Sequence, residues 1–145
     1  MNTGLMFSSK EEKWQTPQDV FDKLNEEFNF TLDPCCQIDS AKCSKFYTPK
    51  EDGLIQNWQG ETVFVNPPYG RELKKWVEKC YNESYNDNTT VVMLIPARTD
   101  TRYFHEFIYH IAEIRFLKGR IKFINPTTKL PADAAPFPSM IVIFR

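Results

Sequence analysis

The sequence predicts a single α/β domain with a doubly wound, mostly parallel sheet. Strand-like and helix-like segments alternate along the chain, which favours strands joined by helices that cross over the sheet. The run Thr90–Pro96 is continuously apolar, as in strands buried on both faces of a parallel sheet. The length of 145 residues suits one hydrophobic core and is short for two.

The amino-terminal region divides into a polar stretch and the start of the predicted domain. Residues 1–13 are expected to be flexible, and the domain is expected to span residues 14–145. Pro17 suits the first position of a helix, with Thr16 as its cap. The helix is expected to extend to about Asn29, because apolar residues recur at helical spacing (Val20, Phe21, Leu24 and Phe28).

Further strands and helices follow in the order that this fold class requires. Two more helices are expected, over Leu73–Tyr85 and over Thr101–Ile111. Short runs of β-forming residues, most of them bounded by Pro, Gly or Asn, predict the strands. These strands are Phe30–Asp33, Lys45–Thr48, Thr62–Val65, Thr90–Pro96, Glu113–Gly119, Arg120–Ile124 and Ser139–Phe144.

Three of these strands end in residues suited to ligand binding. Asp33 and Pro34 end and follow the first strand, Asn66–Tyr69 follows the third, and Pro96–Arg98 stands at the end of the fourth. Sheets of this class bind ligands at the carboxyl ends of their parallel strands. We therefore expect the three ends to form one cleft, provided that the strands are parallel neighbours. Taken alone, Asp33-Pro34 also fits an ordinary turn.

The tetrapeptide Asn66-Pro67-Pro68-Tyr69 has the chemistry of a site for a planar amino group. The Asn66 side chain and the Pro67 backbone each offer a carbonyl oxygen, and Pro68 restricts the direction of the second. Two such acceptors bind both hydrogens of one exocyclic amine, and they leave its lone pair free to point at an electrophile. Tyr69 offers a ring that stacks on a flat heterocycle. Catalysis is therefore expected to work by positioning, without a His, Cys or Lys nucleophile.

Charge narrows the class of partners. The formal net charge is −1, so the chain is not a basic DNA-coating protein. Residues 97–130 nevertheless hold seven Lys/Arg against three Asp/Glu, whereas residues 1–60 hold six against ten. This distribution fits a domain with one face for a cationic or neutral cofactor and another for a polyanion, and it fits chance equally well. The basic residues also fit an ordinary solvated surface. The candidate phosphate contacts are Arg98, Arg102, Lys118, Arg120 and Lys122.

Other features argue against a metal site and a membrane segment. The spacing of Cys35, Cys36, Cys43 and Cys80 does not suit zinc, so reduced thiols and no metal are expected. No stretch has the length of a membrane span, and the amino terminus lacks a signal-peptide pattern. A cytoplasmic protein is therefore expected. The sequence leaves open whether the chain is a monomer or a homodimer.

Around its tetrapeptide the sequence resembles the amino-group methyltransferases that use S-adenosylmethionine, whose signature is [DNS]-P-P-[YFW]. It is similar in particular to the phage-type DNA N-6-adenine methyltransferases, the Dam family. The resemblance covers roughly residues 14–144 in order and spacing. It rests on Thr16-Pro17, Leu32–Cys36 (LDPCC), Ala41–Thr48 (AKCSKFYT), Glu51–Leu54 (EDGL), Trp58, Val63–Tyr69 (VFVNPPY), Leu94–His105, Phe116–Phe123 and Ala135–Phe144.

The resemblance implies a Rossmann-like methyltransferase fold with a C-terminal antiparallel strand. It also implies S-adenosylmethionine as cofactor, and methyl transfer to the exocyclic amine of an adenine flipped out of double-stranded DNA. Asn66 and Pro67 would then hold the amine, and Tyr69 would stack on the base. Asp33 would face the ammonium group of the cofactor, and Asp52 its adenosine. The full set of cofactor contacts would be Thr16, Pro17, Asp33, Pro34, Cys35, Asp52, Leu54, Asn66 and Pro96.

Two features depart from the wider methyltransferase pattern. No Gly-rich turn follows the first strand, and only residues 34–44 separate the first two strands, which is short for a crossover helix. Other functions therefore stay open. The methyl acceptor could be an adenine in RNA or the amide of a protein glutamine. The chain could also be a non-catalytic DNA-binding module on the same fold.

Overall fold

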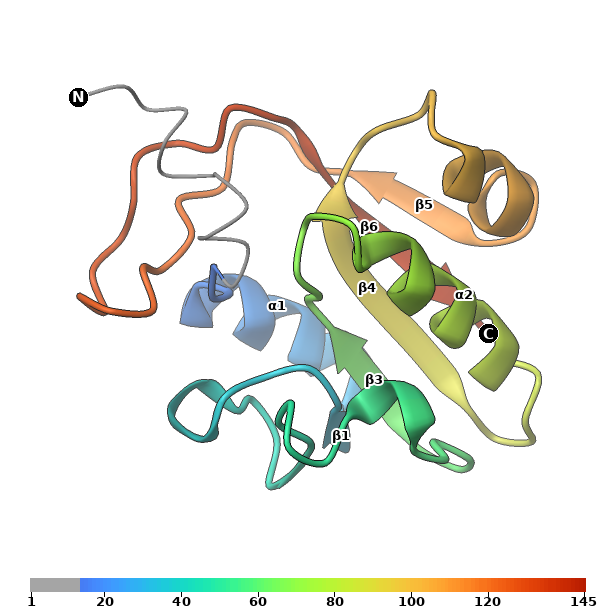
Figure 1. Cartoon of the computed structure of the whole chain (residues 1–145). Helices are drawn as coiled ribbons and strands as arrows, with labels where there is room; N and C mark the ends of the chain where they lie inside the picture. The colour runs from blue at the N-terminus through green and yellow to red at the C-terminus, as the bar shows by residue number, and fades with distance from the viewer. Residues whose placement is uncertain (1–13) are drawn as a thin grey trace.

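The described residues, 14–145 of a computed structural model, form an α/β structure built on one six-stranded sheet (Figure 1). The segment 1–13, expected to be flexible, lies outside the described residues. The strand order is β2-β1-β3-β4-β6-β5. The strands are β1 (Leu32–Asp33), β2 (Lys45–Phe46), β3 (Thr62–Val65), β4 (Thr90–Pro96), β5 (Glu113–Phe116) and β6 (Ser139–Phe144).

Strand directions confirm a mostly parallel sheet with a C-terminal antiparallel strand. Each pair among β2, β1, β3 and β4 is parallel, whereas β6 runs antiparallel between β4 and β5. The observed bounds of β3, β4 and β6 are those that the sequence predicts. β1 and β2 are shorter than predicted, since each pairs over two residues only.

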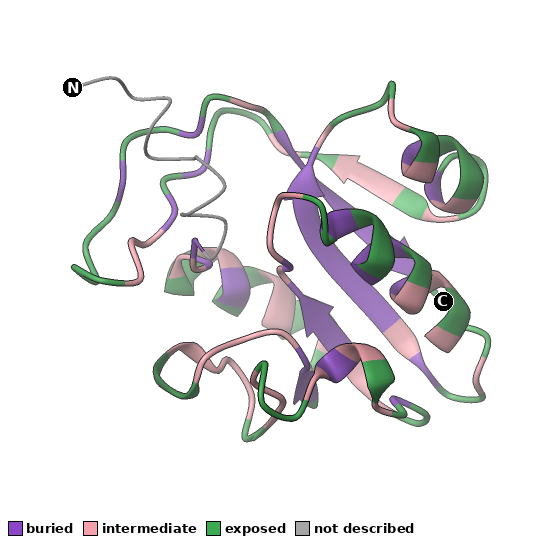
Figure 2. Ribbon diagram, in the orientation of Figure 1, coloured by how far each residue is buried: buried purple, intermediate pink, exposed green. Residues whose placement is uncertain are grey.

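Helices cover both faces of the sheet, which confirms the doubly wound arrangement. Side chains alternate along β3, so that Val63 and Val65 pack on one face with α2 (Leu73–Glu83). Phe64 packs on the other face with α1 (Gln18–Phe28). Figure 2 shows the result, with the central strands buried and α2 exposed only on its outer side.

The chain reverses direction across the sheet between β1 and β3. It moves outward from β1 to β2 at one edge, then returns to place β3 on the other side of β1. Such a switch point leaves a crevice at the carboxyl ends of the two strands, where ligands bind in open α/β sheets. Asp33 ends β1 and Asn66 follows β3, so the fold brings both residues to this crevice.

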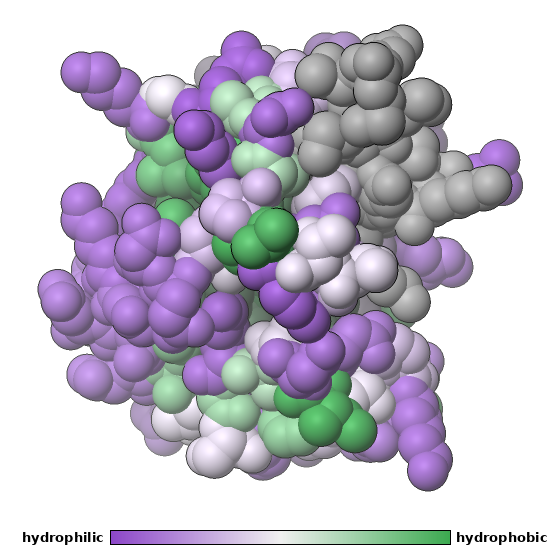
Figure 3. Space-filling view, turned by 90° about the vertical axis from the view of Figure 1, so that its left-hand side faces the viewer, coloured by the Kyte–Doolittle hydropathy of each residue, from purple (hydrophilic) through white to green (hydrophobic). Residues whose placement is uncertain are grey.

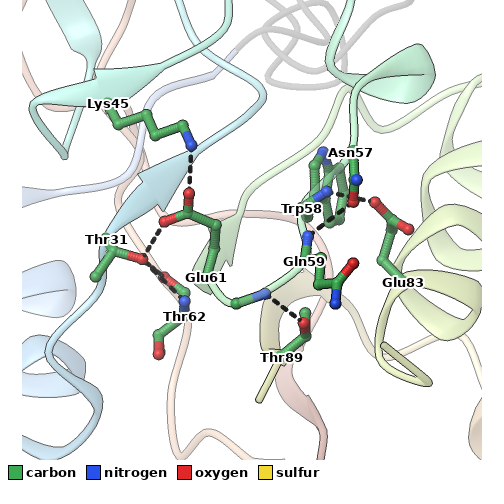
Figure 4. A network of polar contacts seen from close by, with 10 residues as sticks. Thr31, Lys45, Asn57, Trp58, Gln59, Glu61, Thr62, Glu83 and Thr89 are labelled. Atoms are coloured by element: carbon green, nitrogen blue, oxygen red, sulfur yellow. Dashed lines mark hydrogen bonds and ion pairs between the residues drawn. The ribbon is translucent and has the colours of Figure 1, made fainter. Parts of the chain in front are cut away.

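The connection from β1 to β2 contains no crossover helix. It holds only the three-residue 3-10 helix η3 (Ile38–Ser40), and a second short helix, η4 (Gly53–Ile55), precedes β3. At the opposite end of the sheet, a polar network anchors the amino end of β3 (Figure 4). There the Thr31 hydroxyl accepts from the Thr62 amide at 2.9 Å, and the Trp58 amide donates to Glu83 at 2.6 Å. The end of β3 opposite the crevice is thus tied to its neighbours.

Two predicted features are wrong, and a third is confirmed only over part of its range. Arg120–Ile124 is not a sheet strand, because Ile124 bridges Gln15 and Pro131 instead. The helix expected over Thr101–Ile111 is the five-residue π-helix η5 (Phe104–Ile108). Thr16 does not cap α1, whose N-cap residue is Pro17 with no side-chain cap hydrogen bond.

The segment between β5 and β6, residues 117–138, runs far from the sheet edge. It is drawn from orange to red in Figure 1 and reaches across to the side of α1. Four of its residues join the core on the α1 face: Ile121, Phe123, Ala132 and Ala135. Backbone hydrogen bonds between Gln15 and Ile124 attach it to the strand-like residues before α1.

Within residues 14–145, no helix is long and apolar enough to cross a membrane.

Candidate active site

A cavity of about 300 Å³ lies at the switch point between β1 and β3. Of the nine residues predicted to contact a cofactor, seven line it: Thr16, Asp33, Pro34, Cys35, Asp52, Leu54 and Asn66. Pro17 and Pro96 do not line it, because Pro17 begins the turn into α1 and Pro96 is buried in its pairing with Ser139. Of the tetrapeptide, Asn66 and Pro68 line the cavity, whereas Pro67 and Tyr69 do not.

The Asn66 amide has a defined orientation. Its nitrogen Nδ2 donates to the Thr16 hydroxyl at 2.9 Å and to the Trp14 carbonyl oxygen at 3.2 Å. A carbonyl oxygen only accepts, so the side of the amide that faces Trp14 must be the NH₂ group. The Asn66 carbonyl oxygen Oδ1 therefore points the other way.

Tyr69 contacts that oxygen. Its hydroxyl lies 2.6 Å from Asn66 Oδ1 and 3.1 Å from the Leu94 carbonyl oxygen. Burial raises the pKa of Tyr69 well above its usual value, so the hydroxyl stays a neutral donor. Its ring packs edge-on against Phe123 and Phe137, with centroids 5.8 and 5.7 Å apart. In this structure Tyr69 thus belongs to an aromatic cluster and covers the acceptor oxygen of Asn66.

Asp33 places a buried carboxyl group at the end of β1. The residue is 3% exposed, and its two oxygens accept backbone N–H bonds from Lys42 at 3.0 Å and Cys35 at 3.3 Å. Burial raises its pKa to about 6, and the two backbone donors oppose that rise. At neutral pH the group is therefore mostly an anion, with a binding preference for a cationic ligand.

The loop at η4 forms another wall of the cavity. Asp52 has a positive φ of 59°, and its side chain accepts from the Leu54 amide at 3.1 Å. Gly53 packs so closely on Pro34 that no side chain fits between them. The buried Trp58 indole donates to the Gly53 carbonyl at 3.1 Å. These contacts hold Asp52 and Leu54 against the end of β1.

Several lining residues were missed from the sequence. They are Trp14, Gln15, Cys36, Gln37, Ser40, Lys42, Thr48, Pro49, Gly53, Phe64, Glu72 and Trp76. Most of them lie within or beside the segments predicted to form the site. Lys42 and Thr48 could have been found from the sequence, because both belong to the Ala41–Thr48 segment on which the family resemblance rests. Within residues 14–145, no three His, Cys, Asp or Glu side chains are grouped as metal ligands.

The five candidate phosphate contacts are all exposed, and the fold brings one of them, Arg98, close to the aromatic cluster of Tyr69. The Arg98 guanidinium lies 5.8 Å from the centroid of the Phe137 ring, which in turn packs on Tyr69. Arg120 donates to the Ala135 carbonyl oxygen at 3.2 Å. Arg102 instead lies 3.7 Å from Glu106.

The molecular face at the left of Figure 1 is largely hydrophilic, with small apolar patches (Figure 3).

Comparison with known proteins relates nearly the whole chain to phage enzymes. Residues 5–145 match the family model for DNA N-6-adenine-methyltransferase (Dam). The chain is 34% identical over 140 residues to the DNA N-6-adenine-methyltransferase of Haemophilus phage HP1, over 94% of this chain and 80% of that protein. It is 29% identical over 153 residues to the DNA N-6-adenine-methyltransferase of Escherichia phage T1, over 91% of this chain and 62% of that protein.

Among solved structures, 23S rRNA methyltransferase ErmE superposes with a TM-score of 0.41 and 13% identity, over 90% of this chain and 50% of that chain.

The residues that match the family model include the elements around the cavity. These are β1, η4 and the tetrapeptide that follows β3, and the match also includes strand β6 of the sheet. The chain therefore belongs to the DNA N-6-adenine-methyltransferase (Dam) family.

Proposed function

We propose that this protein transfers a methyl group from S-adenosylmethionine to the exocyclic amine of adenine in double-stranded DNA. The observation that supports it best is the Asn66 amide, which stands at the end of β3 beside a cavity and has its carbonyl oxygen directed by two fixed partners. S-adenosylmethionine would supply the methyl group as an electrophile, so that a nitrogen–carbon bond would form as the sulfur–methyl bond breaks. The amine would lose one proton to solvent water.

Asn66 and Pro67 act by holding the amine. The Asn66 side-chain oxygen and the Pro67 backbone oxygen each accept one amine hydrogen, which favours a pyramidal nitrogen with its lone pair toward the methyl group. In the structure the Tyr69 hydroxyl lies 2.6 Å from the Asn66 oxygen. Adenine binding therefore replaces that contact, and the Tyr69 ring is then available to stack on the base.

The cavity residues suit S-adenosylmethionine. The cofactor supplies an electrophilic methyl group on a sulfonium, and it carries an ammonium group and an adenosine. The buried Asp33 carboxylate suits the ammonium, because no side-chain hydrogen bond from a cationic residue satisfies it in the described structure. Leu54 and Trp76 offer apolar walls, and Asp52 lies beside them for the hydroxyls of the adenosine.

The DNA must present the adenine outside its base pair. A paired adenine has its amine engaged with thymine, so the base has to leave the stack before Asn66 and Pro67 reach both hydrogens. Arg98, whose guanidinium lies against Phe137 of the Tyr69 cluster, holds a phosphate near the extruded base, and Arg120 is a further candidate contact. A mismatched adenine should then be methylated faster than a paired one, because its extrusion costs less.

Replacement of Asn66 by alanine tests this function. Methyl incorporation into plasmid DNA should fall by about 10²–10³-fold, since one preorganised electrostatic partner is lost. Calorimetric affinity for S-adenosylmethionine should change little. The control is Asn82→Ala on the exposed side of α2, which should keep normal activity.

Methyl transfer to other acceptors would contradict the proposed substrate. Labelled methyl transfer is measured in parallel to double-stranded DNA, RNA and a glutamine-containing protein. Preferred transfer to RNA or protein would replace the proposed substrate. Binding of DNA without binding of S-adenosylmethionine would assign the chain as a non-catalytic module.

A further inference from the structure

The Thr16 hydroxyl is buried, yet the start of α1 does not use it. Thr16 is 4% exposed, and α1 begins after Pro17 without a side-chain cap. A buried hydroxyl without a partner is costly, so its partner indicates what the residue does. That partner is the Asn66 side-chain amide, 50 residues away in the chain and 2.9 Å away in space.

Asn66 needs such a partner to present the correct atom. The last torsion of an asparagine side chain is broad and roughly two-fold, so the amide group turns easily when nothing holds it. A half-turn would place NH₂ where the proposed reaction needs an acceptor. Thr16 and the Trp14 carbonyl both bind Nδ2, and together they keep Oδ1 on the acceptor side.

The segment that carries these two partners is itself held in place. Gln15 exchanges two backbone hydrogen bonds with Ile124, at 3.0 and 2.9 Å. In an extended segment alternate residues face the same side, so Trp14 and Thr16 are both buried, whereas Gln15 between them is partly exposed. Pro17 then fixes the backbone at the next position. The hydroxyl of Thr16 is therefore presented from a stiff support.

We propose that Thr16 is a positioning residue that orients the Asn66 amide for methyl transfer. Its main role is then neither to bind the cofactor nor to cap helix α1. This inference rests on the proposed function for its kinetic part. The contact between Thr16 and Asn66 lies within the protein itself, so its structural part is tested separately.

The test compares Thr16→Val with Thr16→Ser. Valine keeps the shape but lacks the hydroxyl, whereas serine keeps the hydroxyl. Thr16→Val should lower kcat on plasmid DNA about tenfold, the effect of one buried hydrogen bond. The calorimetric Kd for S-adenosylmethionine and the KM for DNA should stay within about twofold of the original values, because the Thr16 hydroxyl is bonded to Asn66 and valine keeps the shape of this residue in the cavity wall. Thr16→Ser should restore most of the turnover.

A second measurement does not depend on activity. In the cofactor-free protein, the side-chain NH₂ resonances of Asn66 are assigned by their loss in Asn66→Ala. In Thr16→Val they should shift and exchange faster with solvent, and in Thr16→Ser they should stay near their original positions.

The outcomes separate the two proposals. Absence of methyl transfer by the unaltered protein on any DNA would contradict the proposed function, and the resonances would still test the contact. Normal kcat in Thr16→Val would overturn the positioning role. The positioning role would also be overturned if weaker cofactor binding explained the loss of turnover, or if the valine and serine variants had equal defects. Unchanged Asn66 resonances in Thr16→Val would overturn it as well.

Discussion

Replacing Gly53 by alanine is expected to open the wall of the cavity. A Cβ at Gly53 would lie 2.1 Å from the Pro34 carbonyl oxygen and 3.0 Å from the carbonyl carbon. Both are backbone atoms, so no side-chain rotation relieves the clash. The η4 loop must therefore move away from the end of β1. Gly53 is required by space, since its φ is not among the positive ones.

The expected cost has two parts. Overpacking of a well-packed site costs about 1–3 kcal/mol, and a rigid backbone contact belongs at the upper end. Movement of Gly53 also breaks its bond from the buried Trp58 indole, and an unsatisfied buried donor costs about 1–3 kcal/mol. We expect Gly53→Ala to lower the free energy of unfolding by about 4 kcal/mol, which for this chain length lowers Tm by about 8–16 °C.

Urea denaturation measures this loss, with Gly119→Ala as the matched control. Gly119 has a positive φ of 78° and nothing within 4 Å of a built Cβ. Alanine there strains only the local backbone, at about 1–2 kcal/mol. Gly53→Ala should also weaken S-adenosylmethionine binding, and Gly119→Ala should not. Equal destabilisation by the two substitutions would refute the argument from space.

Three further results are expected. Burial raises the pKa of Asp33 to about 6 in the folded protein. Between about pH 4 and 6, Asp33 therefore carries a proton in the folded protein but has lost it in the unfolded chain. The free energy of unfolding of the cofactor-free protein should therefore fall by about 3 kcal/mol as pH rises through that window, and urea titrations of Asp33→Asn should lack this component. Tyr69→Phe keeps the ring but uncovers the Asn66 oxygen, so adenine DNA should bind at least as tightly, whereas Tyr69→Ala should lose about 1–3 kcal/mol of stacking in a DNA-binding titration. Lys122→Ala should weaken DNA binding uniformly across sequences and reduce the slope of log K against log salt by about 1, whereas Lys74→Ala on α2 should leave that slope unchanged.

The strands that could be predicted with their true ends are those with long apolar runs. β6 is buried throughout and β4 is buried from Val91 onward, so their composition alone marks where they begin and end. Arg120–Ile124 has an equally strand-like composition but lies outside the sheet. Its Ile124 pairs with Gln15, a residue more than 100 positions away, and local pattern contains no information about such a partner.

The same division holds in the candidate site. Two adjacent prolines after β3 restrict the backbone wherever they occur, so the chain itself determined a stiff loop of acceptors that ends in a tyrosine. Which way the Asn66 amide points was decided only by tertiary structure. The sequence places Thr16 at the start of a helix and assigns it to the helix cap, where threonine is favoured. The fold instead brings the end of β3 to the segment before α1, and Asn66 becomes the partner of that hydroxyl. Backbone restriction is a property of neighbouring residues, whereas the pairing of buried polar groups depends on what the folded chain brings within 3 Å.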